Sequence, residues 1–375
     1  MKPSLAIAIT TLLVAALACG TSTGQAPTPG PYPTPAHSIF DGGRTAYGFF
    51  PSPPEVTLQS VMATIQGIGR HGDILLVQRN IPWNDFRKSP DGASQDIVDA
   101  LNMMILARQS NLEAVFVVDT LNGLNRREFL GMPFGWQASF ANPDVRAAYS
   151  NYALRILREF HPQYLGLASE INTYADFHPD DFPNFLSLYR EVYARIKAEA
   201  PQTRVFVTFQ WEELNNMIPG VPGGGQPYHT RWDQIETFEP QLDVWAISSY
   251  PFIAFQHGSD IPANYYSPLL ARTKKPLAVA EGGFTSKPVG TLRGTPADQV
   301  AYLSAIHTQI GSRLAFWIYL LYSDFNLDSY AKMMNAQGQG ADVNTLGMFA
   351  SVGLTASDGT PKPALAVWDG FRSNP

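Results

Sequence analysis

The sequence has a single cysteine, Cys19, in 375 residues, so no intramolecular disulfide is possible. Charged residues make up only 15% of the chain and the formal net charge is -6. The chain therefore lacks the basic footprint that nucleic-acid binding requires. A low charge combined with 12% aromatic residues suits a neutral, ring-shaped ligand better than a polyanion.

Several short catalytic and cofactor motifs are also missing. The first predicted strand is followed by YGFFPSPPE, which has no G-x-G-x-x-G phosphate turn. No predicted strand is followed by a G-x-S-x-G elbow, which argues against a serine esterase. The histidines are scattered without H-E-x-x-H or another metal-ligand spacing. We therefore expect no cofactor and no metal, and we expect a monomer.

The N-terminus has the pattern of an exported protein. Lys2 precedes an apolar stretch from Leu5 to Leu17, which is too short for a permanent membrane span, and Ala16-Leu17-Ala18-Cys19 follows. This ending resembles a bacterial lipobox, in which the cysteine is lipidated and becomes the first mature residue. The resemblance implies an anchor at Cys19 that holds the protein outside the cell membrane or the outer membrane. An ordinary secretory signal cleaved nearby is the alternative.

The chain divides into three parts. Residues 1-18 are the predicted signal peptide, and residues 19-37 are a tether of Thr, Ser, Gly, Gln, Ala and Pro with too little apolar surface to fold. Residues 38-375 have enough apolar content for one large core. We expect this part to be a single catalytic domain.

Apolar runs of strand length recur along this domain, and helical patterns follow them. Helix starts are expected at Ser94, at Asn142-Pro143-Asp144 and at Thr295-Pro296. Eight strands alternating with helices predict a (β/α)8 TIM barrel. The predicted strands are Thr45 to Phe50, Asp73 to Arg79, Ala114 to Asp119, Tyr164 to Glu170, Arg204 to Gln210, Leu242 to Tyr250, Leu277 to Glu281 and Leu314 to Leu320.

Two glutamates stand at the ends of predicted strands, Glu170 in LGLASEIN and Glu281 in LAVAEGGF. The carboxyl ends of barrel strands are where catalytic residues gather. Hydrolysis of a glycosidic bond needs two carboxyls, one to protonate the leaving oxygen and one to attack the sugar carbon. Further polar and aromatic residues stand at or shortly after the ends of the predicted strands. They are Arg79, Trp83, Asp119, Asn172, Tyr174, Gln210, Trp211, Tyr250 and Trp317.

At these positions the chain resembles clan A of the glycoside hydrolases, and within it the endo-β-1,4-galactanases of family 53. The segments that carry the resemblance are LGLASEIN, LAVAEGGF, DVWAISSYPF, FWIYL and GLTASDGTPKPALAVW. The resemblance implies that Glu170 is the acid/base and Glu281 the nucleophile. It also implies that Tyr250 supports the nucleophile and that Trp317 forms the floor of the substrate site.

One residue departs from the clan pattern. Ser169 stands where clan members have an asparagine that binds the substrate 2-hydroxyl, and a serine cannot replace both functions of an amide. Asn172 could bind that hydroxyl instead, or catalysis is weakened. We expect a retaining mechanism, with Glu281 kept ionised by Tyr250 and by a cation, for which Arg79 is the candidate.

The remaining site candidates each have a plain alternative. Trp83, Trp211 and Tyr174 could stack on sugar rings or simply pack, and Arg79 could belong to an ordinary salt bridge. Glu212 and Glu213 could bind sugar hydroxyls, although we expect them to be solvated. Asp119 and Gln210 complete the set of predicted substrate-binding residues.

The sequence thus predicts a tethered enzyme that cleaves β-linked oligo- or polysaccharides. The second possibility is an inactive hydrolase barrel that binds carbohydrate as a lipoprotein, which Ser169 favours. A barrel hydrolase that acts on another bond is the third.

Overall fold

The computed structural model describes residues 38-222, 224-336, 340 and 343-373. The predicted signal peptide, Cys19 and the tether lie outside this part of the chain. In the described part, no helix has the length and apolar character that crossing a membrane requires.

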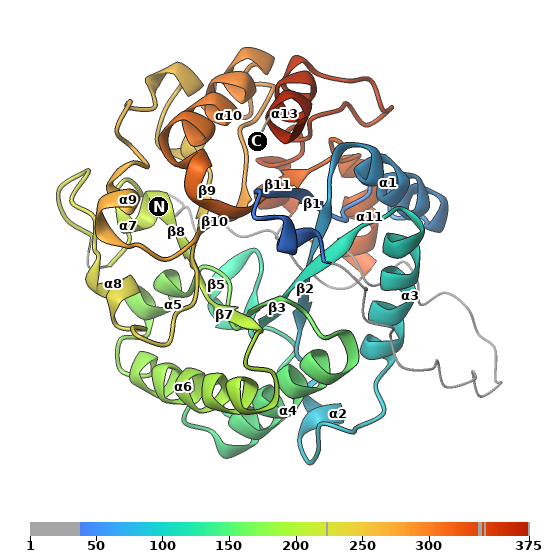
Figure 1. The fold of residues 1–375 in the computed structure, drawn as a ribbon, viewed down its shortest axis with the longest axis vertical. Helices are drawn as coiled ribbons and strands as arrows, with labels where there is room; N and C mark the ends of the chain where they lie inside the picture. The colour runs from blue at the N-terminus through green and yellow to red at the C-terminus, as the bar shows by residue number, and fades with distance from the viewer. Residues whose placement is uncertain (1–37, 223, 337–339, 341–342, 374–375) are drawn as a thin grey trace.

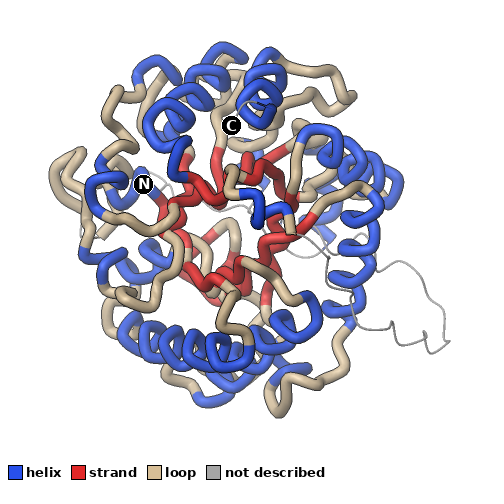
Figure 2. Tube along the Cα trace, in the orientation of Figure 1, coloured by secondary structure: helices blue, strands red, loops and turns tan. Residues whose placement is uncertain are grey.

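A parallel sheet curls into a barrel at the centre of the molecule (Figures 1 and 2). The order of neighbours is β7-β6-β3-β2-β1-β11-β10-β9-β8. The two end strands, β7 and β8, are separated in sequence only by Val207, so they act as one strand that closes the ring. The predicted eight-stranded TIM barrel is therefore confirmed. Its strands are β1 (Ala46–Phe50), β2 (Ile74–Asn80), β3 (Glu113–Asp119), β6 (Tyr164–Gly166), β7 (Arg204–Phe206), β8 (Thr208–Gln210), β9 (Trp245–Ser249), β10 (Leu277–Gly282) and β11 (Leu314–Leu321).

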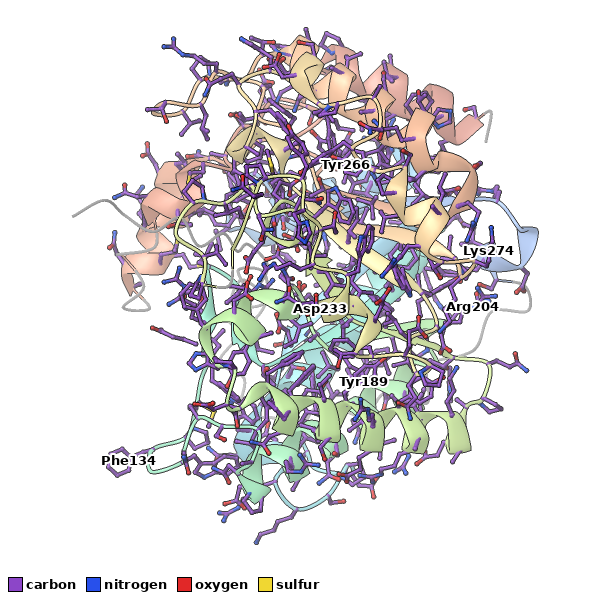
Figure 3. The ribbon with its side chains drawn as sticks, turned by 90° about the vertical axis from the view of Figure 1, so that its left-hand side faces the viewer. Phe134, Tyr189, Arg204, Asp233, Tyr266 and Lys274 are labelled. Atoms are coloured by element: carbon purple, nitrogen blue, oxygen red, sulfur yellow. The ribbon has the colours of Figure 1, made fainter. Side chains whose placement is uncertain are left out.

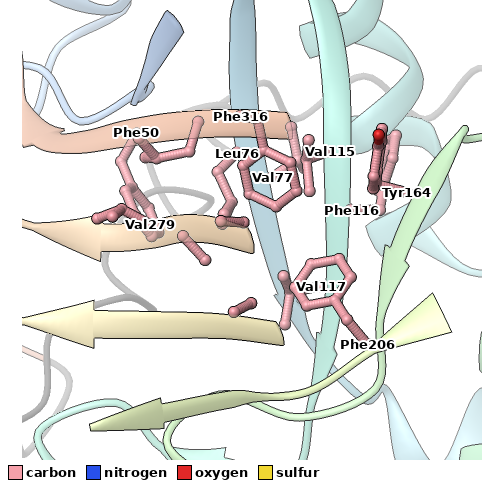
Figure 4. Close-up of a cluster of buried hydrophobic side chains, with 14 of the residues drawn as sticks. Phe50, Leu76, Val77, Val115, Phe116, Val117, Tyr164, Phe206, Val279 and Phe316 are labelled. Atoms are coloured by element: carbon pink, nitrogen blue, oxygen red, sulfur yellow. The ribbon is translucent and has the colours of Figure 1, made fainter. Parts of the chain in front are cut away.

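Apolar side chains fill the barrel interior (Figure 4). The Phe316 ring of β11 lies 5.7 Å from that of Phe206 and 5.2 Å from that of Tyr164, measured between ring centroids. β11 is a neighbour of neither β6 nor β7 in the sheet, so the contacts of Phe316 run across the interior. Because side chains alternate between the two faces of a strand, every second residue of β11 points inward.

Helices surround the barrel and cover its outer face (Figure 1). Asn142 accepts a hydrogen bond from the Asp144 amide, and Thr295 forms a capping box with Asp298, so both predicted helix starts are confirmed. Ser94 precedes its helix but makes no capping bond. The longer helices are α1 (Leu58–His71), α3 (Gln95–Gln109), α4 (Pro143–Phe160), α6 (Phe182–Glu199), α10 (Pro296–Ile310), α11 (Leu327–Ala336) and α13 (Pro363–Ser373).

Short elements line the loops that connect strands to helices. One is a hairpin after β3, formed by β4 (Leu121–Asn122) and β5 (Asn125–Phe129). The others are the helices α2 (Trp83–Phe86), α5 (Ile171–Phe177), α7 (Trp211–Leu214), α8 (Asp233–Glu236), α9 (Pro268–Arg272) and α12 (Val343–Gly347), and 3-10 turns at Ile39–Gly42, Pro251–Ile253, Gly258–Asp260 and Gly311–Arg313.

Candidate active site

Glu170 is delivered by a turn that follows β6 directly. The strand ends at Gly166, earlier than predicted, and Glu170 has a left-handed backbone with φ 49° and ψ 44°. This conformation costs a bulky residue on the order of 1 kcal/mol, and such strain clusters at functional sites. The amide of Glu170 donates to Thr208 Oγ1 at 2.8 Å. The side chain is fully buried, and Glu170 is the N-cap residue of α5.

Glu281 lies in β10 and is only 2% exposed. Tyr250 Oη donates a hydrogen bond of 2.5 Å to Glu281 Oε1, which is the contact that the sequence predicts. Glu281 Oε2 is buried and has no hydrogen-bond partner. A buried carboxylate oxygen without a donor disfavours the ionised form and leaves one side of the group open for a reaction partner.

A buried arginine that the sequence reasoning missed, Arg126 of β5, ties the site together. Its Nε donates to Glu170 Oε2 at 3.2 Å and its Nη2 donates to Ser169 Oγ at 3.0 Å. Its Nη1 forms an ion pair with Asp119. The segment NRREF offers two adjacent arginines, and only the pairing of β4 with β5 decides that Arg126 turns inward.

Two further donors complete the surroundings of these carboxyls. Ser248 Oγ of β9 donates to Glu170 Oε1 at 2.5 Å, and Gln78 Nε2 of β2 donates to Asp119 Oδ2 at 2.6 Å. Asp119, a predicted substrate-binding residue, is therefore engaged by protein partners. Its part in the site is to hold Arg126.

The electrostatic surroundings of the two carboxyls differ. Burial raises the pKa of Glu281 well above its usual range, and the charge of Glu170 raises it further. Burial also raises the pKa of Glu170, but the Arg126 guanidinium opposes that rise. The pKa of Arg126 is raised because the nearby carboxylates outweigh its burial. In the resting site Glu170 is thus the better stabilised anion of the two.

The structure contradicts the expected role of Arg79. Its guanidinium forms an ion pair with Asp96 of α3, and its Nη2 also donates to the Asp96 carbonyl at 3.0 Å. Gln78 is the residue of this pair that faces the carboxyls, because neighbouring side chains on a strand point to opposite faces. Arg79 therefore belongs to the contact between barrel and helix, and Arg126 is the cation of the site.

The structure also contradicts Trp317 as the floor of the site. Its ring packs on Trp368 and Phe371 of α13, at centroid distances of 5.2 and 6.4 Å. The adjacent Phe316 is the residue that points into the barrel. Trp317, the next residue along β11, therefore points to the outer face of the strand and packs between the barrel and α13.

Asn172 and Gln210 join the start of α5 to the end of β8. Asn172 Oδ1 accepts from the Gln210 amide at 2.8 Å, and its Nδ2 donates to the Gln210 carbonyl at 3.3 Å. Gln210 Oε1 accepts from the Glu213 amide and its Nε2 donates to Glu212 Oε2 at 2.7 Å. Both side chains are buried and satisfied by the protein, so Asn172 is not free to replace the missing asparagine.

The three predicted stacking platforms are buried in aromatic packing. Trp83 donates to the Leu130 carbonyl at 2.8 Å, and Tyr174 donates to Asp181 Oδ2 at 2.8 Å. The ring of Trp211 lies 6.3 Å from that of Tyr266. None of the three exposes more than 2% of its surface, so their contacts support the packing alternative.

Glu212 and Glu213 are buried, contrary to the expectation that they are solvated. Glu212 accepts from Ser249 Oγ at 2.6 Å and from the Tyr250 amide at 2.9 Å. Burial raises the pKa of Glu212 to about 7, although its hydrogen-bond donors oppose that rise. Glu213 accepts from Thr173 Oγ1 at 2.8 Å. Glu212 therefore braces the segment that carries Tyr250.

Aromatic side chains pack behind the Glu281 side of the site. Tyr250 lies edge-on to Phe349, with 5.0 Å between ring centroids, and Phe349 is fully buried. Glu170 and Glu281 are closed off from solvent in this state. In the described residues no group of three or more His, Cys, Asp or Glu is arranged to hold a metal ion.

Comparison with known proteins gives the fold but no family. No protein-family model matches the chain, and no curated protein does. Solved structures do match. An exo-β-1,4-mannosidase from an Opitutaceae bacterium superposes with a TM-score of 0.59 at 14% identity, over 88% of this chain and 59% of that one. A Streptomyces cattleya protein crystallised with Manβ1-4GlcNAc gives 0.60 at 14% identity, over 88% and 80%.

Fungal β-1,4-galactanases also match, with a TM-score of 0.52 at 13% identity, over 88% of this chain and 95% of theirs. The fold is the barrel that these glycoside hydrolases share. The galactanases do not stand out among these structures, so the comparison does not favour family 53. The chain spans less than two thirds of the mannosidase, and at such low identities the match concerns the fold alone.

Proposed function

We propose that this protein is a glycoside hydrolase that cleaves β-linked sugar chains. The observation that carries the proposal is the placement of two buried glutamates, one in the turn after β6 and one near the end of β10, close enough for the charge of Glu170 to raise the pKa of Glu281. Tyr250 and Arg126 hold one carboxyl each. The structural neighbours include proteins described as β-mannosidase and β-galactanase, which supports the choice of bond.

The mechanism that we propose is retention in two steps. Glu281 attacks the anomeric carbon and forms an ester, while the bond to the leaving oxygen breaks and Glu170 donates a proton to that oxygen. Glu170 then takes a proton from water, whose oxygen attacks the same carbon and releases Glu281. Both steps restore the starting protonation after one turnover.

This mechanism requires Glu170 to be protonated and Glu281 to be ionised when the sugar is bound. Because the charge of Glu170 raises the pKa of Glu281, a proton on Glu170 favours the ionised form of Glu281. Arg126 keeps its ion pair with Asp119 when Glu170 is neutral. Substrate entry must also open the site, because neither glutamate is more than 2% exposed.

The test is hydrolysis of galactans, glucans, mannans and xylans by the wild type and by the variants Glu170→Gln and Glu281→Gln. We expect both variants to lose at least about a thousandfold in kcat, because the two carboxyls act in one sequence of steps. Glu213→Gln is the matched control, since Glu213 is a buried glutamate of the same rim whose side chain contacts Thr173. NMR of the products shortly after mixing identifies the anomer that is released first. If this is the β-anomer, the result supports retention.

Azide separates the two roles. With an activated substrate, azide should restore turnover to Glu281→Gly and give the α-glycosyl azide, whereas Glu170→Gly should give the β-azide. The opposite assignment would mean that the roles of the glutamates are exchanged.

The second candidate is an inactive barrel that binds carbohydrate, and the closure of the site together with the Arg126 contact to Ser169 favours it. If the wild type binds a β-glycan but releases no reducing ends from any of the four polymers, this candidate replaces the first.

We also propose that Cys19 carries a lipid and that the barrel works outside the membrane. Labelled palmitate should enter the wild type and should not enter Cys19→Ser. A labelled Cys19→Ser variant would refute the anchor.

A further inference from the structure

A small pocket lies between the α7–α8 connection and the segment that leads into α9. These three helices lie together on one side of the barrel (Figure 1). The pocket has a volume of about 390 Å³, which is within the range of small-ligand sites. Its lining consists of Asn215, Tyr228, Thr230, Asn264, Tyr265 and two prolines. We call it the tyrosine pocket.

The chemistry of this lining fits an uncharged, hydroxyl-rich ring. No charged residue takes part in it. The rings of Tyr228 and Tyr265 meet edge to face with 6.4 Å between centroids. Aromatic rings suit the apolar C-H face of a pyranose, while amides and hydroxyls suit its rim.

Tyr228 is held in an unfavourable conformation. Its φ is 63°, in the left-handed region that an aromatic residue rarely adopts, and its side chain is 54% exposed. The Tyr228 amide donates to the Asn215 carbonyl at 2.9 Å, and the Asn216 side chain donates to the Gln226 and His229 carbonyls at 3.3 and 2.7 Å. The left-handed conformation of Tyr228 lowers the stability of the fold and leaves the ring exposed, and such strain is typical of functional sites.

The opposite wall of the tyrosine pocket is rigid and leads to the buried site. Tyr265 is only 4% exposed, and its Oη lies 3.4 Å from Glu212 Oε1. Glu212 in turn accepts from the Tyr250 amide, and Tyr250 holds Glu281. A wall that is fixed before the ligand arrives lowers the entropy cost of binding.

We propose that the tyrosine pocket is a subsite that binds one uncharged sugar ring of a β-linked chain. The choice of a carbohydrate rests on the proposed function. The ring stacks on Tyr228 and its hydroxyls contact the exposed amide of Asn264, because the side chains of Asn215 and Thr230 already bond each other.

The test uses thio-linked β-disaccharides of galactose, glucose, mannose and xylose, which resist hydrolysis, with affinity measured by calorimetry on the full barrel. Tyr228→Asn removes the ring and suits the left-handed backbone. We expect it to weaken binding between about two- and tenfold, the effect of losing one aromatic contact. Tyr228→Phe should bind as the wild type does.

Phe134→Ala is the matched control, because Phe134 is an exposed aromatic residue on a protruding loop and does not line the pocket (Figure 3). It should leave the affinity unchanged. The subsite is refuted if none of the disaccharides binds at concentrations up to about 10 mM, or if Tyr228→Asn binds as tightly as the wild type.

These outcomes are separate from the proposed function. Hydrolysis combined with binding that does not depend on Tyr228 would remove the subsite and leave the enzyme. Binding that depends on Tyr228 without any hydrolysis would remove the enzyme and leave the subsite.

Discussion

Arg126→Met removes the only cation that contacts Glu170 in the described part of the chain, and it tests the electrostatic account of the site directly. Arg126 is fully buried and contacts Asp119, Glu170 and Ser169. Methionine has a similar volume and carries no charge, so the change leaves the acidic side chains of Asp119, Glu170 and Glu281 in a buried space without their counter-ion.

The expected loss is large. Removing one partner of a buried ion pair costs about 3 to 5 kcal/mol, because the other partner stays buried and uncompensated. With an unfolding entropy of about 2.1 cal/mol/K per residue and roughly 340 folded residues, this corresponds to a fall in Tm of about 4 to 7 °C.

The loss should grow with pH. The pKa values of Glu170 and Glu281 are raised by folding, so the folded state binds more protons than the unfolded state above the ordinary glutamate range. Stability therefore falls as pH rises through that window. Without Arg126 both pKa values rise further, so the variant loses more stability at pH 8 than at pH 5.

Urea denaturation at pH 5 and pH 8 measures both effects. Arg87→Met is the control, because Arg87 forms an exposed ion pair with Asp144 at 2.8 Å and should cost less than about 1 kcal/mol at either pH. If Arg126→Met costs no more than this control, or costs the same at both pH values, the charge account of the site is refuted.

Three further variants test neighbouring contacts. Tyr250→Phe removes the hydrogen bond to Glu281 and should lower kcat by about tenfold or more; an unchanged kcat in the hydrolysis assay would exclude the support role. Glu212→Gln should abolish a fall in wild-type stability of about 3 kcal/mol between pH 4.5 and 8, since the folded pKa of about 7 lies above the ordinary value; denaturation curves that keep this slope would contradict it. Arg79→Lys should leave the pH profile of hydrolysis unmoved, because Arg79 pairs with Asp96 on the helix side, and a shifted profile would return Arg79 to the site.

The strands could be predicted because a parallel strand that is covered on both faces forms a short, continuous apolar run in the sequence. The structure has a strand in each of the predicted ranges. The strand ends located Glu170, Glu281 and Tyr250, and the structure brings these three side chains together. Their roles in hydrolysis stay predictions.

The direction in which each side chain points was not predictable. The sequence of a strand that is apolar on both faces does not show which alternate residues face inward. For this reason Arg79 was predicted in the site where Gln78 lies, and Trp317 was predicted to face inward where Phe316 does. Sequence patterns are local, whereas this choice depends on the closure of the whole sheet.

The sequence by itself determined the barrel and the two glutamates at its rim. Only the tertiary structure decided what surrounds them, namely Arg126 from a hairpin, Ser248 from β9 and a solvent-free enclosure. The reason is physical: composition and spacing fix which residues a strand end carries, but the pKa of a buried carboxyl depends on charges and donors that come from distant parts of the chain.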